Sequence, residues 1–218
     1  MIQHHPSGEV LSDWARAALH PGAMLAVGCH VHLCAICRQE ATLWESVGGA
    51  LLDSANPAPL SEGALARALA RIDEGDRRLR HAKERRAPAF LERFNVPAPL
   101  LQNRIGMRRW VTPRIWFAPV VIAPTSIART YLVYGSANTT LPVHTHVGRE
   151  FTTVLHGSFC DSTGTFGTGD FAETDDTITH APAVTQDNAC LCLISADAPM
   201  RLAGRPARFV QALAGRLY

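Results

Sequence analysis

A short motif, His-x3-Cys-x2-Cys, constrains the fold of this chain more than any other feature of its sequence. It consists of His30, Cys34 and Cys37. On one helix these positions would fall within about 60° of each other around the axis. One helical face can therefore present an imidazole and two thiolates to one ion, and these are donors that structural zinc prefers. The amino-terminal pair His4–His5 is the nearest source of a fourth ligand. The motif predicts a small helical unit held by zinc, which favours regulation over catalysis.

Two other interpretations of the cysteines stay open. A lone Cys-x2-Cys can be a redox pair, and buried thiols are often only small apolar side chains. A redox pair of the thioredoxin type would follow a strand at the start of a helix. Here the motif lies in an Ala-rich, helix-favouring stretch with His30 one turn upstream. This context favours zinc.

Residues 1–86 are predicted to be helical throughout. Apolar periodicity predicts helices over residues 9–20, 23–34 and 35–52, and Ser61 can cap a fourth helix. We expect the apolar stripes of the last two helices to form a core. These stripes consist of Leu43, Val47 and Leu51, and of Leu65, Leu69, Ile72 and Leu79. Four short helices bury little surface, so zinc would supply part of the stability.

Charge is distributed unevenly along the chain, although the net charge is only +2. Residues 1–76 hold 9 acidic and 4 basic side chains, a balance of −5, and residues 77–100 hold 7 basic and 2 acidic ones, a balance of +5. An acidic helical unit does not suit phosphate contacts but suits a basic protein partner. The basic run RRLRHAKERR is expected to be a solvated helix face or linker. We therefore expect no direct binding of nucleic acid.

The general class follows from composition and from the Pro-rich middle of the chain. The sequence predicts an α + β protein with a helical domain over 1–86, a linker over 87–100 and a second domain over 101–218. No apolar run is long enough to span a bilayer, and MIQHHPSGEV lacks the regions of a signal peptide. Six unevenly spaced cysteines fit a reducing compartment. We therefore expect a cytoplasmic protein with no membrane partner.

The second domain is predicted to be all β. The segments WVTPRIWFAPVVIAP, ARTYLVYGS, REFTTVLHGSF and ACLCLIS are rich in Val, Ile, Thr and aromatic residues and are separated by turn residues. Short strands without helical partners favour an antiparallel sandwich or barrel.

A second metal constellation lies within these strands. His144, His146 and Glu150 share parity, so on one continuous strand they would point to one face, the barrel interior. His180 follows about one hairpin later, and Gly157 stands where a tight turn is needed. Three imidazoles and one carboxylate suit Zn, Mn, Fe or Ni. The alternative is that these histidines only fill the barrel or lie on the surface.

The second half of the chain resembles the cupin family. The string HTHVGRE, followed after six residues by Gly157, matches the first cupin motif. The second motif is looser: Gly167-Thr-Gly169-Asp170 stands where Pro-x-Gly-Asp is common, and no Asn follows His180 at the usual offset.

Taken together, both halves resemble the ChrR-type anti-sigma factors. The resemblance rests on the segments HHPSGEVLSDWARAAL and HVHLCAICRQEATLWESVGGALL, followed by the cupin-like half. The resemblance implies a helical domain that binds an extracytoplasmic-function-type sigma factor, and a cupin-like domain needed for release on oxidative stress, with singlet oxygen as the signal. It implies zinc in both domains, on His5, His30, Cys34 and Cys37 and on His144, His146, Glu150 and His180.

Two other functions compete with this one. A metal-dependent cupin enzyme, such as a dioxygenase, is chemically feasible because such a ligand set leaves open positions on an octahedral metal. The sequence offers no identifiable substrate-binding set, so we expect no enzyme activity. A DNA-binding regulator using residues 77–93 is disfavoured by the acidic first domain.

Overall fold

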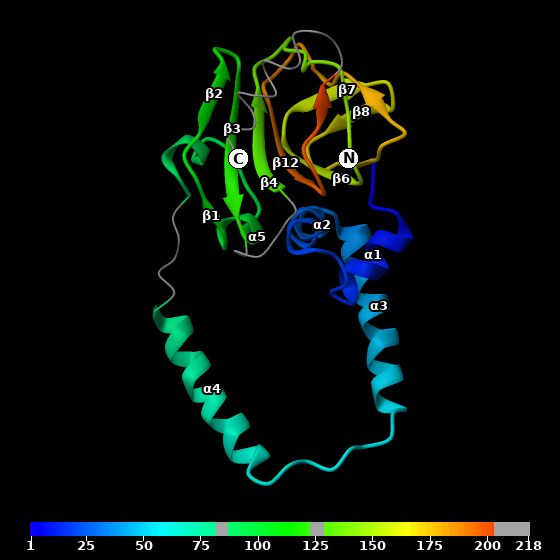
Figure 1. Ribbon diagram of the computed structural model, residues 1–218, viewed down its shortest axis with the longest axis vertical. Helices are drawn as coiled ribbons and strands as arrows, with labels where there is room; N and C mark the ends of the chain where they lie inside the picture. The colour runs from blue at the N-terminus through cyan, green and yellow to red at the C-terminus, as the bar shows by residue number, and fades with distance from the viewer. Residues whose placement is uncertain (82–86, 123–128, 203–218) are drawn as a thin grey trace.

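The computed structural model describes residues 1–81, 87–122 and 129–202, and the side chains of residues 73–81 are outside this description. Helices occupy the first part of the chain and antiparallel strands the second, which confirms the predicted α + β class. The strands form one body, and two helices project away from it (Figure 1). The side chain of Leu79 and the basic run at 77–86 lie outside the described side chains.

The first two helices are α1 (Gly8–Ala15) and α2 (Pro21–Leu33). The helix predicted over 9–20 is shorter than expected because Ala17 adopts a φ of 55°, which a helix does not allow. Pro21 does not simply end a helix but begins the next one, since proline suits the first turn. The His20 side chain caps α2 by accepting a hydrogen bond from the Ala23 amide.

The zinc motif does not lie on one helical face, so that prediction was wrong. Cys34 has an extended backbone (φ −102°, ψ 112°), and it separates α2 from α3 (Ala35–Asp53), which are bent by 118°. His30 lies in the last turn of α2 and Cys37 in the first turn of α3. Among the described residues no single helix is long and apolar enough to cross a membrane. The bent α2–α3 pair reaches that threshold only by length and composition.

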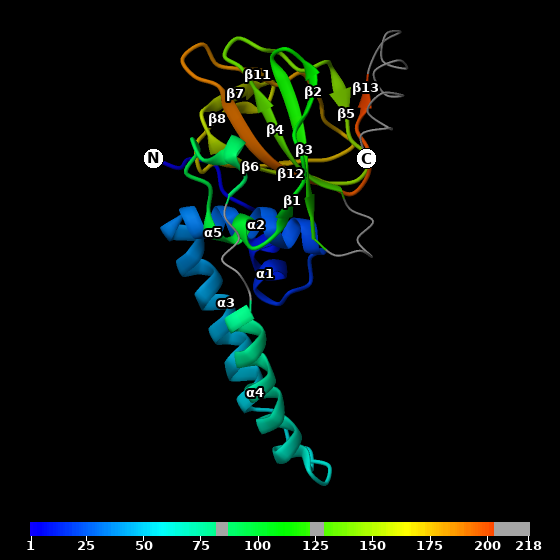
Figure 2. The ribbon, with the colours of Figure 1, turned by 90° about the vertical axis from the view of Figure 1, so that its left-hand side faces the viewer.

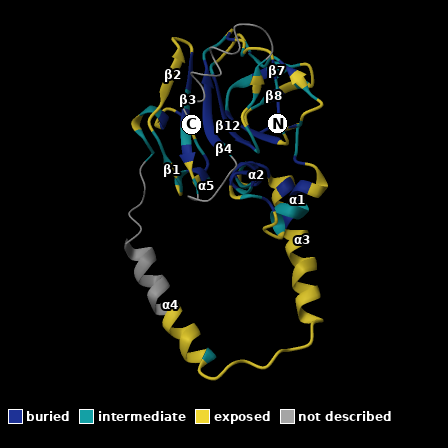
Figure 3. Ribbon diagram, viewed as in Figure 1, coloured by how far each residue is buried: buried dark blue, intermediate teal, exposed yellow. Residues whose placement is uncertain are grey.

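Helices α3 and α4 (Ala64–His81) do not pack into the predicted core. Leu43 is 64% exposed and Leu69 is 53% exposed, and the rest of both described stripes is also exposed (Figure 3). In α3 only Cys37 and Ala41 are buried. Figure 1 shows the two helices as separate legs joined by the loop at their far ends, and Figure 2 shows them from the side. The predicted four-helix core is therefore wrong for these two helices.

The strands form one large and two small antiparallel sheets. The seven-stranded sheet has the order β1 (Arg104–Ile105), β3 (Ile115–Val121), β4 (Arg129–Gly135), β12 (Cys190–Ala196), β6 (Glu150–His156) and β9 (Phe171–Thr174), with β2 (Arg109–Thr112) also on β3. The small sheets are β10 (Thr179–His180), β5 (His144–Thr145) and β13 (Arg201–Leu202), and β11 (Ala183–Val184), β7 (Ser158–Asp161) and β8 (Gly164–Gly167).

The central strands of the large sheet, β4, β12 and β6, are buried on both faces, which explains their continuous apolar runs. All seven residues of β12 are buried. Leu191 and Leu193 belong to the core beneath α2, whereas Cys190 and Cys192 belong to the core between the sheets. An antiparallel sheet with one solvated face would alternate instead.

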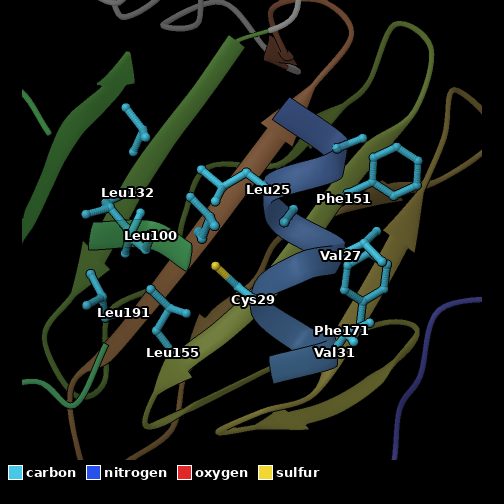
Figure 4. Close-up of a cluster of buried hydrophobic side chains, with 14 of the residues drawn as sticks. Leu25, Val27, Cys29, Val31, Leu100, Leu132, Phe151, Leu155, Phe171 and Leu191 are labelled. Carbon is cyan, nitrogen blue, oxygen red and sulfur yellow. The ribbon is translucent and has the colours of Figure 1, made fainter. Parts of the chain in front are cut away.

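Helix α2 covers the outer face of this sheet and joins the two halves of the molecule. Leu25, Val27 and Val31 lie over the sheet in Figure 4 and share one hydrophobic core with it. The Thr153 hydroxyl, on β6, donates a hydrogen bond of 2.7 Å to the Ala26 carbonyl. This bond occupies the carbonyl's second lone pair within a dry interface.

The Pro-rich stretch predicted to be a linker packs against the same core. It contains a 3-10 helix (Ala89–Leu91) and α5 (Ala98–Leu101), and the side chains of Leu91 and Leu100 are fully buried. In Figure 4 Leu100 lies beside Leu132, within the hydrophobic cluster that α2 shares. The predicted domain boundaries at 86 and 100 stay a prediction, and residues 82–86 are outside the described part of the chain.

Candidate metal centres

Four predicted ligands converge where α2 meets α3. One ligand atom from each of His5, His30, Cys34 and Cys37 lies within 4.8 Å of the others. His5 Nδ1 is 3.5 Å from Cys34 Sγ and 3.3 Å from Cys37 Sγ, and His30 Nε2 is 3.2 Å from Cys37 Sγ. Tetrahedral zinc places its nitrogen and sulfur ligands about 3.6 Å apart. The donor set and its spacing therefore fit one closed zinc site.

The structure distinguishes between the two amino-terminal histidines. His5 belongs to the converging group. His4 points away: its Nε2 lies 3.1 Å from the Thr165 carbonyl oxygen, and its ring packs on Phe166 with centroids 4.4 Å apart. His5 is therefore in position to supply the fourth ligand.

The protonation of His30 suits a metal ligand. Its Nδ1 lies 2.7 Å from the Gly169 carbonyl oxygen, which can only accept, so Nδ1 carries the proton and Nε2 presents a lone pair. Burial lowers the pKa of His30 to about 4, which keeps the ring neutral at neutral pH. Burial and the neighbouring Cys34 raise the pKa of Cys37 to about 12 without metal. Zinc ligation would deprotonate this thiol.

Three of the four residues of the second predicted set, His144, His146 and His180, also converge, but not from one strand. His144 belongs to β5, whereas Glu150 begins β6 in the large sheet, so the shared-strand prediction was wrong. The chain changes sheets between the two, and His146 lies in that connection. His180, on β10, is directly opposite His144 in the antiparallel register. Cross-strand pairing thus brings these two ligands together despite their separation in sequence.

Gly157 occupies the tight turn predicted for it. It adopts a φ of +71° between β6 and β7. A Cβ atom there would overlap the Ala189 carbonyl oxygen. Both the left-handed backbone and the lack of space require glycine.

Three imidazole nitrogens face one another at this second centre. His180 Nε2 lies 3.0 Å from His146 Nε2 and 3.1 Å from His144 Nε2. Nδ1 of His144 lies 2.8 Å from the acceptor-only Pro142 carbonyl oxygen, so its Nε2 carries a lone pair. Facing lone pairs at this distance repel unless a cation lies between them. Nitrogen ligands at right angles on one metal are about 3.0 Å apart, which fits a metal with open positions.

Asp161 holds this centre and was missed by the sequence analysis. Its Oδ2 is 2.6 Å from His180 Nδ1, and its Oδ1 accepts hydrogen bonds from the Thr163 amide and hydroxyl. Burial acts to raise the pKa of Asp161, but the donors on Thr163 and His180 lower it below its usual value. A carboxylate behind a metal-binding imidazole fixes its tautomer and orientation. The carboxylate lies on β7, far from the His motif in sequence, so spacing carried no signal for it.

Glu150 occupies a different position from the three histidines. Its Oε2 lies 3.4 Å from Nδ1 of His146, and both side chains are buried. The converging group among the described residues consists of the three histidines without Glu150. Direct ligation by Glu150 stays a prediction.

A cavity of about 60 Å³ opens beside this centre. Its walls are mainly apolar, and include Phe117, Val133, Leu141, Phe159, Val184, Ile194 and Met200. Cys190 and Cys192 also line it, with sulfur atoms 3.6 Å apart. The hydrogen bond with Cys190, together with burial, raises the pKa of Cys192, so this thiol keeps its proton at neutral pH. Their i, i+2 spacing on a strand was the available sequence signal.

Comparisons with known proteins agree with both halves of this description. Residues 106–198 match the family described as the ChrR cupin-like domain. The chain is 34% identical over 204 residues to the anti-sigma-E factor ChrR of Cereibacter sphaeroides, which covers 92% of each protein.

One solved structure gives the same relation. The crystal structure of Rhodobacter sphaeroides SigE in complex with the anti-sigma ChrR contains a chain that matches with a TM-score of 0.72 and 29% identity, covering 90% of this chain and 100% of that one. An RmlC-like cupin protein from Ralstonia eutropha matches with a TM-score of 0.41 and 12% identity over 49% of this chain and 70% of its own. The extent of the first match confirms the resemblance drawn from the sequence.

Proposed function

This chain belongs to the ChrR family of anti-sigma factors, and from that membership we propose that it sequesters an extracytoplasmic-function-type sigma factor and releases it on oxidative stress of the singlet-oxygen type. The observation that carries the proposal is the match to a relative crystallised with SigE, because it extends over nearly all of this chain and all of that relative. Both the helices and the cupin-like half are thus included.

The exposed stripes of α3 and α4 support a protein partner. Large apolar side chains that remain exposed on both helices include Ile36, Leu43, Trp44, Val47, Leu51, Leu65, Leu69 and Ile72. Contiguous exposed apolar surface of this kind marks interaction sites, and amphipathic helices commonly bind through such stripes. A sigma factor bound there would cover α3 and α4, and its RNA-polymerase-binding surface would be occluded.

Two zinc ions complete the proposal. His5, His30, Cys34 and Cys37 would hold a closed, structural zinc where α2 meets α3. His144, His146 and His180, with Glu150 beside them, would hold zinc, or alternatively Mn, Fe or Ni. The first ion would set the angle at which α3 leaves the core, and the second would belong to the oxidant-sensing input. A sigma factor as partner also implies a cytoplasmic location.

Affinity measurements with the cognate sigma factor test this function. The double variant Leu43→Glu/Val47→Glu should lower affinity at least about 100-fold, since it places charges in a buried interface. Glu45→Ala, about half a turn away on α3, is the control and should bind normally. A Cys34→Ser/Cys37→Ser variant should lose one zinc per chain and sigma binding with it. Full-strength binding by both double variants would refute the proposal.

Release is tested separately from binding. His144→Ala should empty the second centre, keep sigma affinity nearly unchanged and abolish stress-induced transcription. His156→Ala, a histidine on β6 outside both ligand groups, serves as the control. Loss of sigma binding in the His144 variant would contradict the division into sensor and output.

One observation favours a second candidate function, a metal-dependent cupin enzyme of the dioxygenase type. The apolar cavity adjoins a centre whose geometry leaves open metal positions. Its test is oxygen consumption by the metal-loaded protein with small apolar substrates. Membership in an anti-sigma family ranks this candidate second.

A further inference from the structure

One turn of the cupin-like half touches His30 of the amino-terminal zinc site and the backbone of the residues just before His5. The turn connects β8 to β9 through Gly167, Thr168, Gly169 and Asp170. Its Gly169 carbonyl oxygen accepts the hydrogen bond from His30 Nδ1 at 2.7 Å. Gln3 and His4, which precede His5, bind the same turn through Asp170.

Asp170 fastens the amino-terminal segment to this turn. Its Oδ1 accepts hydrogen bonds from the amides of Gln3 at 2.6 Å and His4 at 3.0 Å, and its Oδ2 accepts one from Gly167 at 2.8 Å. The amide of Phe171 donates to the His4 carbonyl oxygen at 3.1 Å. One carboxylate therefore holds the turn with one oxygen and the backbone next to His5 with the other.

The buried surroundings make these bonds strong. Asp170 is only 4% exposed. Burial acts to raise its pKa, but the amides of Gly167, His4 and Gln3 lower that pKa below its usual value, so the carboxylate is charged. Charge-assisted hydrogen bonds are about twice as strong as neutral ones.

Gly169 allows the segment to lie this close. It adopts a φ of +94°, and a Cβ atom there would come within 2.6 Å of the Ile2 side chain. The shape of the turn and the seat of the amino terminus thus depend on the same residue.

We propose that Asp170 is a positioning residue of the amino-terminal zinc site, and that the turn it closes makes the cupin-like half part of that site. Two of the four ligands depend on it: His30 is oriented by the Gly169 carbonyl, and His5 follows the backbone that Asp170 holds. Residues that orient metal ligands typically change metal affinity 10- to 100-fold when removed. The inference rests on the zinc site proposed above and not on the identity of the sigma partner.

The test uses the full-length protein loaded with cobalt(II) as a zinc substitute. Thiolate-to-cobalt charge-transfer absorption reports the Cys-containing site and is not produced by imidazole or carboxylate ligands. The rate at which this band disappears in excess chelator measures how firmly the site is held. Asp170→Asn should raise that rate at least about 10-fold. Asparagine has only one side-chain oxygen, so it cannot accept hydrogen bonds both from the Gly167 amide and from the amides of Gln3 and His4 in the wild-type arrangement. Asp187→Asn, at an exposed position on the β11–β12 connection, should leave it unchanged.

A second variant guards against loss of folding. Gln3→Pro changes an exposed residue and removes one amide donor to Asp170, while the turn itself keeps its sequence. It should also speed cobalt loss, by less than Asp170→Asn. Ile194→Val destabilises the protein through the other core cluster and should not speed cobalt loss.

The outcomes separate the two ideas. Wild-type protein without the charge-transfer band would show that the zinc site is absent, which overturns the proposed site. Wild-type protein with the band, and unchanged release rates in both Asp170→Asn and Gln3→Pro, would overturn the positioning role. Equal acceleration by Ile194→Val would also overturn it, since general stability would then explain the effect.

Discussion

At the residue scale, the amino-terminal centre combines a thiol that must ionise with an imidazole that is already neutral. The pKa of Cys37 is raised to about 12 and that of His30 is lowered to about 4, both chiefly by burial. Zinc must therefore displace a proton from Cys37, whereas His30 releases none near neutral pH.

This proton release sets the pH dependence of zinc binding. Ligation of Cys37 releases its proton, so zinc affinity should rise at least about 10-fold per pH unit between about pH 6 and 8 and fall equally as the pH drops. Chelator competition at several pH values measures the slope. Cys37→Ser should lower the slope by one proton per zinc. An unchanged slope in this variant would show that the Cys37 thiol does not ligate the ion.

Asp161 is the corresponding residue at the second centre. Asp161→Asn removes the charge behind His180 and permits the wrong tautomer, so metal affinity should fall about 10- to 100-fold with the fold retained. Metal content after dialysis against a chelator checks this. The exposed Asp187→Asn is the matched control, and equal metal retention in both variants would contradict the role.

At the scale of elements, α3 changes character along its length. Its first turns hold the predicted zinc ligand Cys37 and the buried Ala41, while later residues such as Leu51 are exposed. This exposed part also contains Gly48 and Gly49, and nothing lies within 4 Å of a Cβ atom at either position. A helix with glycines and no tertiary support is only marginally stable.

Replacing Gly48 by alanine should therefore stabilise α3 in the free protein. Gly48→Ala should favour the helix by about 1 kcal/mol, raise helical circular dichroism and tighten sigma binding up to about fivefold, because less ordering is left to binding. Thr42→Ala, on the same helix, controls for general effects of alanine. Weaker binding by Gly48→Ala would mean that this part of α3 is not helical in the complex.

At the scale of the whole molecule, the two halves share one hydrophobic core. Gly22, in the first turn of α2, lies so close to Thr130 and Ser195 that a Cβ atom would overlap both hydroxyl oxygens. Residues 1–86 alone would expose the face of α2 that Leu25 and Val27 bury here. Helix α2 and the large sheet therefore stabilise each other.

The same substitution thus has opposite effects at two positions. Gly22→Ala should lower the free energy of unfolding by about 1–3 kcal/mol, since the overlap outweighs the gain in helix propensity. Gly48→Ala, with open space around it, is the control. Thermal unfolding of the full chain compares them. A stabilised Gly22→Ala variant would show that α2 is not held against the sheet.

The sequence by itself determined the class of the fold and the family, and it predicted candidate ligands for both centres. These features are local: a His-x3-Cys-x2-Cys spacing, a His-x-His pair and the strand-like runs can be recognised within single segments. The side chains of His5, His30, Cys34 and Cys37 lie together. The resemblance favoured His5 over His4, and the path of the amino-terminal segment along the turn at Asp170 gives the physical reason.

Only the tertiary structure decided what each apolar face covers. Periodicity shows that a helix has an apolar stripe but not whether its partner lies in the same chain, so Leu43 and Leu69 were predicted to be buried and are exposed. Conversely, Leu100 in the predicted linker is fully buried. Asp161 and Asp170 act through contacts between segments far apart in the chain. Such contacts produce no recognisable spacing pattern in the sequence, because they join residues that only folding brings together.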